Sequence, residues 1–95
     1  MRRVVAAAIG LVSIAAAAAA AEPPAGAAAC TGCHPASTRV TSPVPRLNGI
    51  ARAAIARAMQ DFRSGARTAT VMDRIAKGFT DAEIQAIAAW YAAQK

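Results

Sequence analysis

The two cysteines and the single histidine of this 95-residue chain lie within five consecutive residues, Cys30-Thr31-Gly32-Cys33-His34. A C-x-x-C-H run of this kind is the attachment signature of c-type haem. In such a site both cysteine sulfurs form thioether bonds with the haem vinyl groups, and the adjacent imidazole becomes an axial ligand of the iron. We therefore expect one covalently attached haem c, held by Cys30 and Cys33, with His34 as the proximal iron ligand.

Three other interpretations of the same residues explain less of the pattern. A C-x-x-C dithiol redox motif belongs with a βαβ unit, and nothing in this chain alternates as strands do. A structural zinc site needs four ligands, whereas the chain has three Cys and His residues in total. A structural disulfide is possible in an exported protein but leaves His34 without a role.

A low-spin electron carrier needs a second axial ligand, and the chain has no second histidine. Methionine sulfur is the usual alternative, and it raises the reduction potential. Beyond the first residue, the candidates are Met59 and Met72. Met59 lies on the apolar side of a predicted helix, where methionine commonly fills the core. Met72 lies at the end of a predicted loop.

The first 21 residues have the pattern of a cleaved secretory signal peptide. A short basic start at Met1-Arg2-Arg3 precedes an apolar, alanine-rich stretch, and Ala19-Ala20-Ala21 before Glu22 fits the cleavage pattern. An uncleaved membrane anchor is the alternative. We expect residues 22–95 to form one exported, periplasmic domain without stable membrane insertion.

The formal net charge of +6 includes Arg2 and Arg3; without them, nine basic residues face five acidic ones, which leaves +4. A basic chain suggests nucleic acid first, but a periplasmic location makes that partner improbable. A moderately basic surface suits docking to an acidic redox partner, although it is equally compatible with ordinary solvation.

The elements that must position these residues are all predicted to be helical. A first helix is predicted over residues 25–33 and an irregular loop over residues 35–48. A second helix over residues 50–64 has Gly65 as its C-terminal cap. Its apolar positions recur at helical spacing: Ile50, Ala54, Ile55, Ala58, Met59 and Phe62.

The C-terminal part adds a short and a long helix. One or two turns are predicted over residues 73–77, closed by Gly78. Thr80 followed by Glu83 forms a capping box that begins the last helix. The apolar face of that helix consists of Ile84, Ile87, Ala88 and Tyr91, with Trp90 beside it. A domain of this size needs a staple, so we expect the haem-free chain to be largely unfolded.

With these elements in place, the chain resembles class I bacterial cytochromes c, and most closely the cytochrome subunits of flavocytochrome c sulfide dehydrogenases. The resemblance runs from the haem motif to the C-terminus. It rests on Pro45-Arg46-Leu47-Asn48-Gly49, on residues 61–67, on residues 70–79 and on the helix through Ala89-Trp90-Tyr91. It implies an all-α class I cytochrome c fold, with three principal helices and loops wrapped around one haem.

The resemblance also implies roles for particular residues. Met72 matches the position of the family's methionine ligand, and the carbonyl of Pro45 should accept the ring N–H of His34. Trp90 or Tyr91 should pack against Gly26. The haem pocket should be lined by Leu47, Ile55, Phe62, Ile75 and Ile87.

For function, the chain shows no acid/base constellation, so we expect electron transfer without a catalytic site of its own. The resemblance implies a haem subunit that accepts electrons from a flavoprotein sulfide dehydrogenase. The alternative is a free electron shuttle of a respiratory or photosynthetic chain, serving other redox proteins. A haem sensor would need an open iron site, against which Met72 argues.

Overall fold

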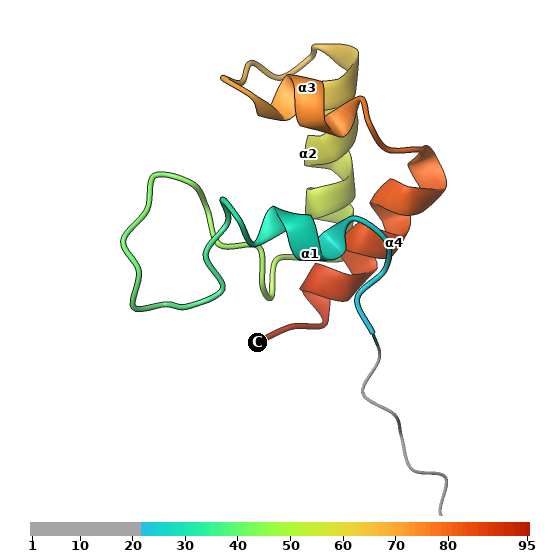
Figure 1. Cartoon of the computed structure of the whole chain (residues 1–95). Helices are drawn as coiled ribbons and strands as arrows, with labels where there is room; N and C mark the ends of the chain where they lie inside the picture. Colours follow the sequence, from blue (N-terminus) through green and yellow to red (C-terminus); the bar gives the residue numbers. More distant parts are fainter. Residues whose placement is uncertain (1–21) are drawn as a thin grey trace, which may run out of the picture.

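The computed structural model describes residues 22–95, so the predicted signal segment lies outside the described residues. Four helices follow one another along the described part, which contains no strand (Figure 1). They are α1 (Ala27–Cys30), α2 (Arg52–Ser64), α3 (Met72–Ala76) and α4 (Asp81–Ala92). Helix α2 packs against both α3 and α4. The all-α class expected from the sequence is confirmed.

Helix α1 is shorter than the sequence predicted. Gly26 has a φ of 84°, a left-handed conformation that cannot belong to the helix, so α1 begins only at Ala27. After Cys30 the chain continues in tight turns, in which the amide of Cys33 donates to the carbonyl of Cys30 at 3.2 Å. The predicted helix over residues 25–33 is therefore one helical turn followed by bends.

Helix α2 agrees with the sequence at its C-terminus and begins two residues later than predicted. Gly65 ends it with a φ of 83°, as a capping glycine does. The loop before it turns at Gly49, whose φ is 79° and whose amide donates to the Tyr91 carbonyl. This contact fixes the entry into α2 against the end of α4.

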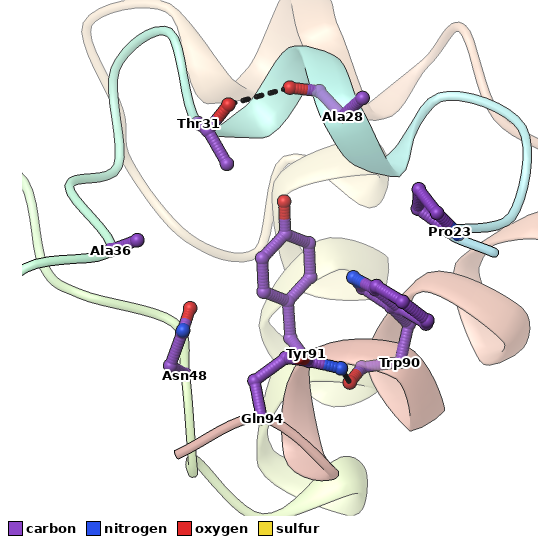
Figure 2. A pocket seen from close by; sticks show the side chains of 8 residues that line it. All are labelled: Pro23, Ala28, Thr31, Ala36, Asn48, Trp90, Tyr91 and Gln94. Carbon is purple, nitrogen blue, oxygen red and sulfur yellow. Dashed lines mark hydrogen bonds between the residues drawn. The ribbon is translucent and has the colours of Figure 1, made fainter. Parts of the chain in front are cut away.

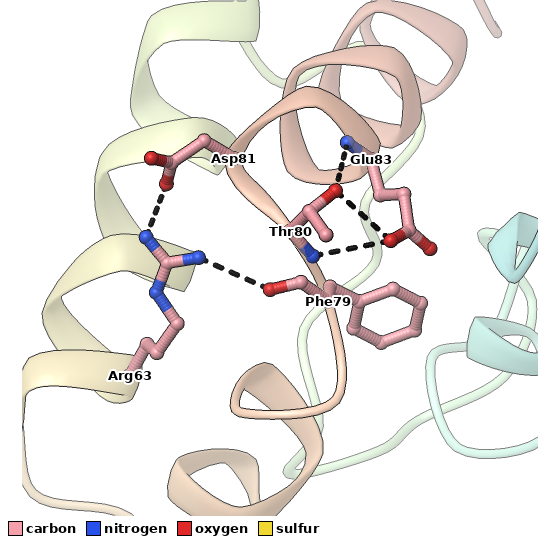
Figure 3. A network of polar contacts seen from close by, with 5 residues as sticks. All are labelled: Arg63, Phe79, Thr80, Asp81 and Glu83. Carbon is pink, nitrogen blue, oxygen red and sulfur yellow. Dashed lines mark hydrogen bonds and ion pairs between the residues drawn. The ribbon is translucent and has the colours of Figure 1, made fainter.

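Helix α4 begins with the predicted capping box. The Thr80 side chain accepts from the Glu83 amide while the Glu83 carboxylate accepts from the Thr80 amide (Figure 3). Arg63 of α2 donates to the Phe79 carbonyl at 3.0 Å and forms an ion pair with Asp81. These contacts hold the connection between α3 and α4 on the surface of α2.

The core is small and lies where the helices cross. Its buried residues are Ala27, Ile55, Ala56, Met59, Ala76, Ile84, Ile87, Ala88 and Tyr91. The predicted apolar face of α4 supplies four of them. In this core Tyr91 reaches α1 through a hydrogen bond from its hydroxyl to the Ala27 carbonyl.

The aromatic ring nearest to Gly26 differs from the sequence prediction. It belongs to Phe79, whose ring would come within 2.5 Å of a Cβ placed on Gly26, and not to Trp90 or Tyr91. Tyr91 contacts the next residue along the chain, since its hydroxyl donates to the carbonyl of Ala27. Gly26 lies outside the helix, and the side on which a Cβ would stand faces Phe79 in the α3–α4 connection.

Within residues 22–95, no helix is long and apolar enough to cross a membrane.

Candidate haem-binding site

The C-x-x-C-H run occupies the end of α1 and the turns that follow it. Both cysteines are free thiols; Cys30 is half-buried and Cys33 is exposed. The Cys30 thiol lies 3.7 Å from the Gly26 carbonyl, and burial raises its pKa. Among the described residues, no group of three or more His, Cys, Asp and Glu side chains could hold a metal ion, which leaves the zinc interpretation without a ligand set.

His34 is oriented by the loop that follows it. Its Nδ1 lies 2.6 Å from the carbonyl oxygen of Pro45, the contact that the sequence resemblance implied. A carbonyl oxygen only accepts hydrogen bonds, so the neutral ring carries its proton on Nδ1 and leaves the Nε2 lone pair available. A histidine that ligates a metal commonly donates its other N–H in this way, which fixes the tautomer and raises the basicity of the ligand.

An apolar cavity of about 730 Å³ opens beside this motif. Cys30, Cys33, His34 and Pro45 all line it, as does Met72. This volume lies within the range of roughly 300–1,000 Å³ typical of ligand and cofactor pockets. The five predicted lining residues all contribute to the wall: Leu47, Ile55, Phe62, Ile75 and Ile87.

Helix α2 supplies one wall through residues spaced four apart. Ile50, just before the helix, and then Ala54, Ala58 and Phe62 lie one turn after another along the cavity. These side chains are exposed or half-buried, whereas Ala56 on another face of α2 is packed into the core. Val71 and Ile75 also line the cavity and are 48% and 39% exposed. An apolar ligand in the cavity would remove this surface from water.

Both methionine candidates lie on the cavity wall. Met59 comes from the middle of α2 and is 8% exposed. Met72 is the first residue of α3 and is half-buried. The structure therefore brings Met72 to the same cavity as His34, and it places Met59 in both the core and the wall.

One side chain on the described cavity wall carries a permanent charge, and it is the cation Arg67. The Arg67 amide donates to the Asp61 carbonyl at 3.1 Å, which closes the turn after α2, and its guanidinium lies 4.8 Å from the centre of the Phe62 ring. No carboxylate among the described residues forms an ion pair with it. An apolar wall with one free cation suits a flat apolar ligand that has carboxylates, and haem with its two propionates is such a ligand.

A second, more open hollow of about 270 Å³ lies beside α1 and includes Thr31 of the haem motif, but neither cysteine nor His34 lines it (Figure 2). Figure 2 shows Trp90 and Tyr91 rising from α4 toward Ala28 and Thr31, with Asn48 and Gln94 below them. None of the candidate iron ligands lies on its wall. The larger cavity is therefore the candidate cofactor site.

Several residues of this wall have no role in the sequence-based prediction. Arg67, Thr70, Val71 and Phe79 were noticed only as parts of matching segments, yet all four line the cavity. Their chain positions offered one signal, because three of them lie in the five residues before Met72. A loop that delivers an axial ligand necessarily runs along the rim of its pocket.

The all-helical fold, with the C-x-x-C-H motif and a methionine lining one cavity, is consistent with a small class I cytochrome c fold. The cofactor that they imply is one covalently bound haem c.

Comparison with known proteins finds two relatives, each a component of a dehydrogenase system. The chain is 42% identical over 62 residues to the cytochrome subunit of sulfide dehydrogenase from Chlorobaculum tepidum, which covers 65% of this chain and 56% of that protein. It is 40% identical over 65 residues to the thiosulfate dehydrogenase electron acceptor of Stutzerimonas stutzeri, which covers 66% and 30% respectively. This chain thus spans about half of the first relative and less than a third of the second. No model of a known protein family matches it.

Proposed function

We propose that this chain is a monohaem cytochrome c that carries single electrons in the periplasm. The observation that carries the proposal is the placement of Cys30, Cys33 and His34 at the mouth of an apolar cavity whose wall includes Met72. Bound there, the haem supplies a one-electron ferrous/ferric couple. In the same proposal, residues 1–21 are a cleaved signal peptide and residues 22–95 are the cytochrome domain.

In this proposal, different residues of the chain attach, ligate and surround the haem. Cys30 and Cys33 provide the sulfurs for covalent attachment, and His34, oriented by Pro45, offers Nε2 as the proximal ligand. Met72 offers its thioether as the second ligand. The aliphatic and aromatic wall excludes water, and Arg67 lies where it can bind a propionate carboxylate.

Within this class, we propose the role of a haem subunit that accepts electrons from a flavoprotein sulfide dehydrogenase. The similarity to the Chlorobaculum tepidum subunit supports it. A second candidate is a free electron shuttle that serves other redox proteins. The similarity to an electron acceptor of thiosulfate dehydrogenase favours that role, since one cytochrome design serves different dehydrogenases.

Mild purification of the tagged protein from the periplasm of its native host tests both levels of the proposal. Haem and flavin absorbance are read on the same fractions, and sulfide is then added. A flavoprotein in stoichiometric amount, with haem reduction on adding sulfide, supports the subunit role. A low-spin haem protein that travels alone and is reduced by generic donors supports the shuttle. A protein that carries no thioether-linked haem contradicts the whole proposal.

A further inference from the structure

The loop over residues 35–48 has little regular structure of its own, yet it delivers the carbonyl that orients His34. Between Pro35 and Arg46, no main-chain amide of this described segment donates to another main-chain carbonyl. Only two local turns, capped by Ser37 and Ser42, stabilise it from within. The position of the Pro45 carbonyl must therefore depend on contacts at the two ends of the loop.

Arg46, the residue after Pro45, makes those contacts. Its Nε donates to the Ala36 carbonyl at 2.6 Å, and Nη1 points to the carbonyl of Asn48 at 3.4 Å. Its Nη2 donates to the main-chain oxygen of Lys95. One guanidinium thus joins both ends of the loop and connects them to the segment after α4.

Two hydrogen bonds join the two ends of this loop. His34 bonds to Pro45, and two residues further on Ala36 bonds to Arg46. The His34–Pro45 bond orients the imidazole. The Arg46–Ala36 bond joins the two ends of the loop immediately next to it. The guanidinium is suited to this task because it presents five N–H donors in a rigid plane, whereas a lysine ammonium presents three donors from one nitrogen atom.

We propose that Arg46 is a positioning residue for the proximal iron ligand. By fixing the Pro45 carbonyl at hydrogen-bonding distance from His34 Nδ1, it maintains the basicity of the imidazole and lowers the reduction potential of the haem. The inference rests on the proposed haem site. It follows from the general behaviour of such hydrogen bonds, because a stronger bond to the outer N–H makes the imidazole a better donor, which favours ferric iron.

The test compares the holoprotein with four variants, two of them at Arg46. Arg46→Gln removes the rigid fork, and Arg46→Lys keeps the charge but replaces the fork with a point donor. Arg52→Gln is the matched control, because Arg52 is exposed at the start of α2 and its guanidinium bonds only to the Gln85 side chain, at 3.3 Å. The readouts are the proton resonance of His34 Nδ1 in the ferrous protein, the reduction potential and the melting temperature.

We expect Arg46→Gln to move the His34 Nδ1 proton resonance and to raise the potential. The expected shift in the equilibrium constant for electron exchange with a fixed partner is roughly two- to tenfold, the worth of one hydrogen bond. Arg46→Lys should show much of the same change, and Arg52→Gln should match the wild type. If Arg46→Gln does not fold, Arg46→Lys alone carries the comparison.

A purely structural role gives a different pattern. Asn48→Ala removes another contact to Lys95, in which Asn48 Nδ2 donates at 3.4 Å, and leaves the Arg46–Ala36 bond intact. Should the Arg46 variants lower the melting temperature as Asn48→Ala does, with an unchanged His34 resonance and potential, the inference is wrong. It is also wrong if Arg46→Lys restores wild-type values, because charge alone would then suffice. Absence of haem from the wild-type protein would instead overturn the proposed function.

Discussion

The hydroxyl of Tyr91 donates a hydrogen bond to the carbonyl oxygen of Ala27, although 64 positions separate the two residues. Both residues are buried, with Ala27 in the helix that ends at Cys30 and Tyr91 near the end of α4. This one contact therefore links the attachment segment to the C-terminal helix. Because the chain has a single tyrosine, ionisation of Tyr91 can be followed without a signal from another tyrosine.

Alkaline pH should weaken the fold through Tyr91. Burial, and then the neighbouring Cys30, raise the Tyr91 pKa from 10.0 to about 12. Because the folded-state pKa is raised, the stabilisation is fully present below pH ~10 and is lost as pH rises toward ~12. In the holoprotein Cys30 would be a thioether without a titratable proton, so urea unfolding of the holoprotein across this range measures the part of the effect that burial causes.

Tyr91→Phe is the control for that measurement. It should cost about 1 kcal/mol at neutral pH, because it removes the bond to Ala27. Its additional loss of stability between pH ~10 and ~12 should be smaller than that of the wild type. Equal alkaline losses in the two proteins would show that Tyr91 does not titrate in this window.

Removal of the haem should leave a largely unfolded chain. Four of the nine buried core residues are alanines, and Ile84 is the one large side chain that is completely buried. The cavity wall adds apolar surface that only a ligand can cover. We expect the double variant Cys30→Ser, Cys33→Ser to show little helical circular dichroism and no cooperative thermal transition. A cooperative transition in this variant would mean that the small core is sufficient.

The features predicted from the sequence are those with a local cause. Thr80 with Glu83 and the glycine at position 65 determine helix ends through contacts within a few residues, and the structure contains both caps. The apolar repeat of α2 likewise predicted one apolar face from helical spacing alone, and all six of its residues line the cavity, although only Ile55 and Phe62 were assigned to the haem pocket.

The features that were missed have tertiary causes. Gly26 combines a left-handed backbone with the close approach of Phe79, a residue from another part of the chain. Arg46 and Arg67 look alike in sequence, yet one binds main-chain carbonyls and the other lies on the cavity wall. No local pattern separates these two roles, since each depends on where distant segments meet.

Substitution of Gly26 tests this close approach. In Gly26→Ala a Cβ would lie 2.5 Å from the Phe79 ring at a φ of 84°, so both a clash and backbone strain are introduced. We expect a loss of about 2–4 kcal/mol in the free energy of unfolding. Gly65→Ala is the matched control, because its φ is 83° and nothing lies within 4 Å of the added methyl group. That variant should lose only about 1 kcal/mol. Equal losses would place the whole effect in the backbone.

Arg67 should control how the haem potential responds to pH. Loss of the cation in Arg67→Gln should lower the potential and raise the propionate pKa by an interaction of about 1 kcal/mol. The potential of the variant should then fall as pH rises through the neutral range, where that of the wild type is flatter. Arg57→Gln is the control, because Arg57 is exposed and pairs with Asp61 on the surface of α2. If the reduction potential of Arg67→Gln is lower by the same amount at every pH, Arg67 acts only as a nearby charge and does not pair with a propionate.

The two methionines on the cavity wall should respond in opposite ways to the same substitution. Met72 begins the five-residue helix α3 and is only half-buried against the core, so Met72→Ala would remove the proposed ligand with a smaller loss of packing than at Met59. It should give a high-spin iron that binds carbon monoxide, in a protein that stays folded. Met59 is 8% exposed in the middle of α2, so Met59→Ala should cost about 2–4 kcal/mol of stability through the cavity it leaves. Its spectrum should remain low-spin, because the thioether of Met72 is intact.

Absorption spectra with and without carbon monoxide, measured beside urea unfolding curves, separate ligation from packing. A low-spin Met72→Ala protein together with a high-spin Met59→Ala protein would assign the ligand to Met59 and make Met72 a packing residue.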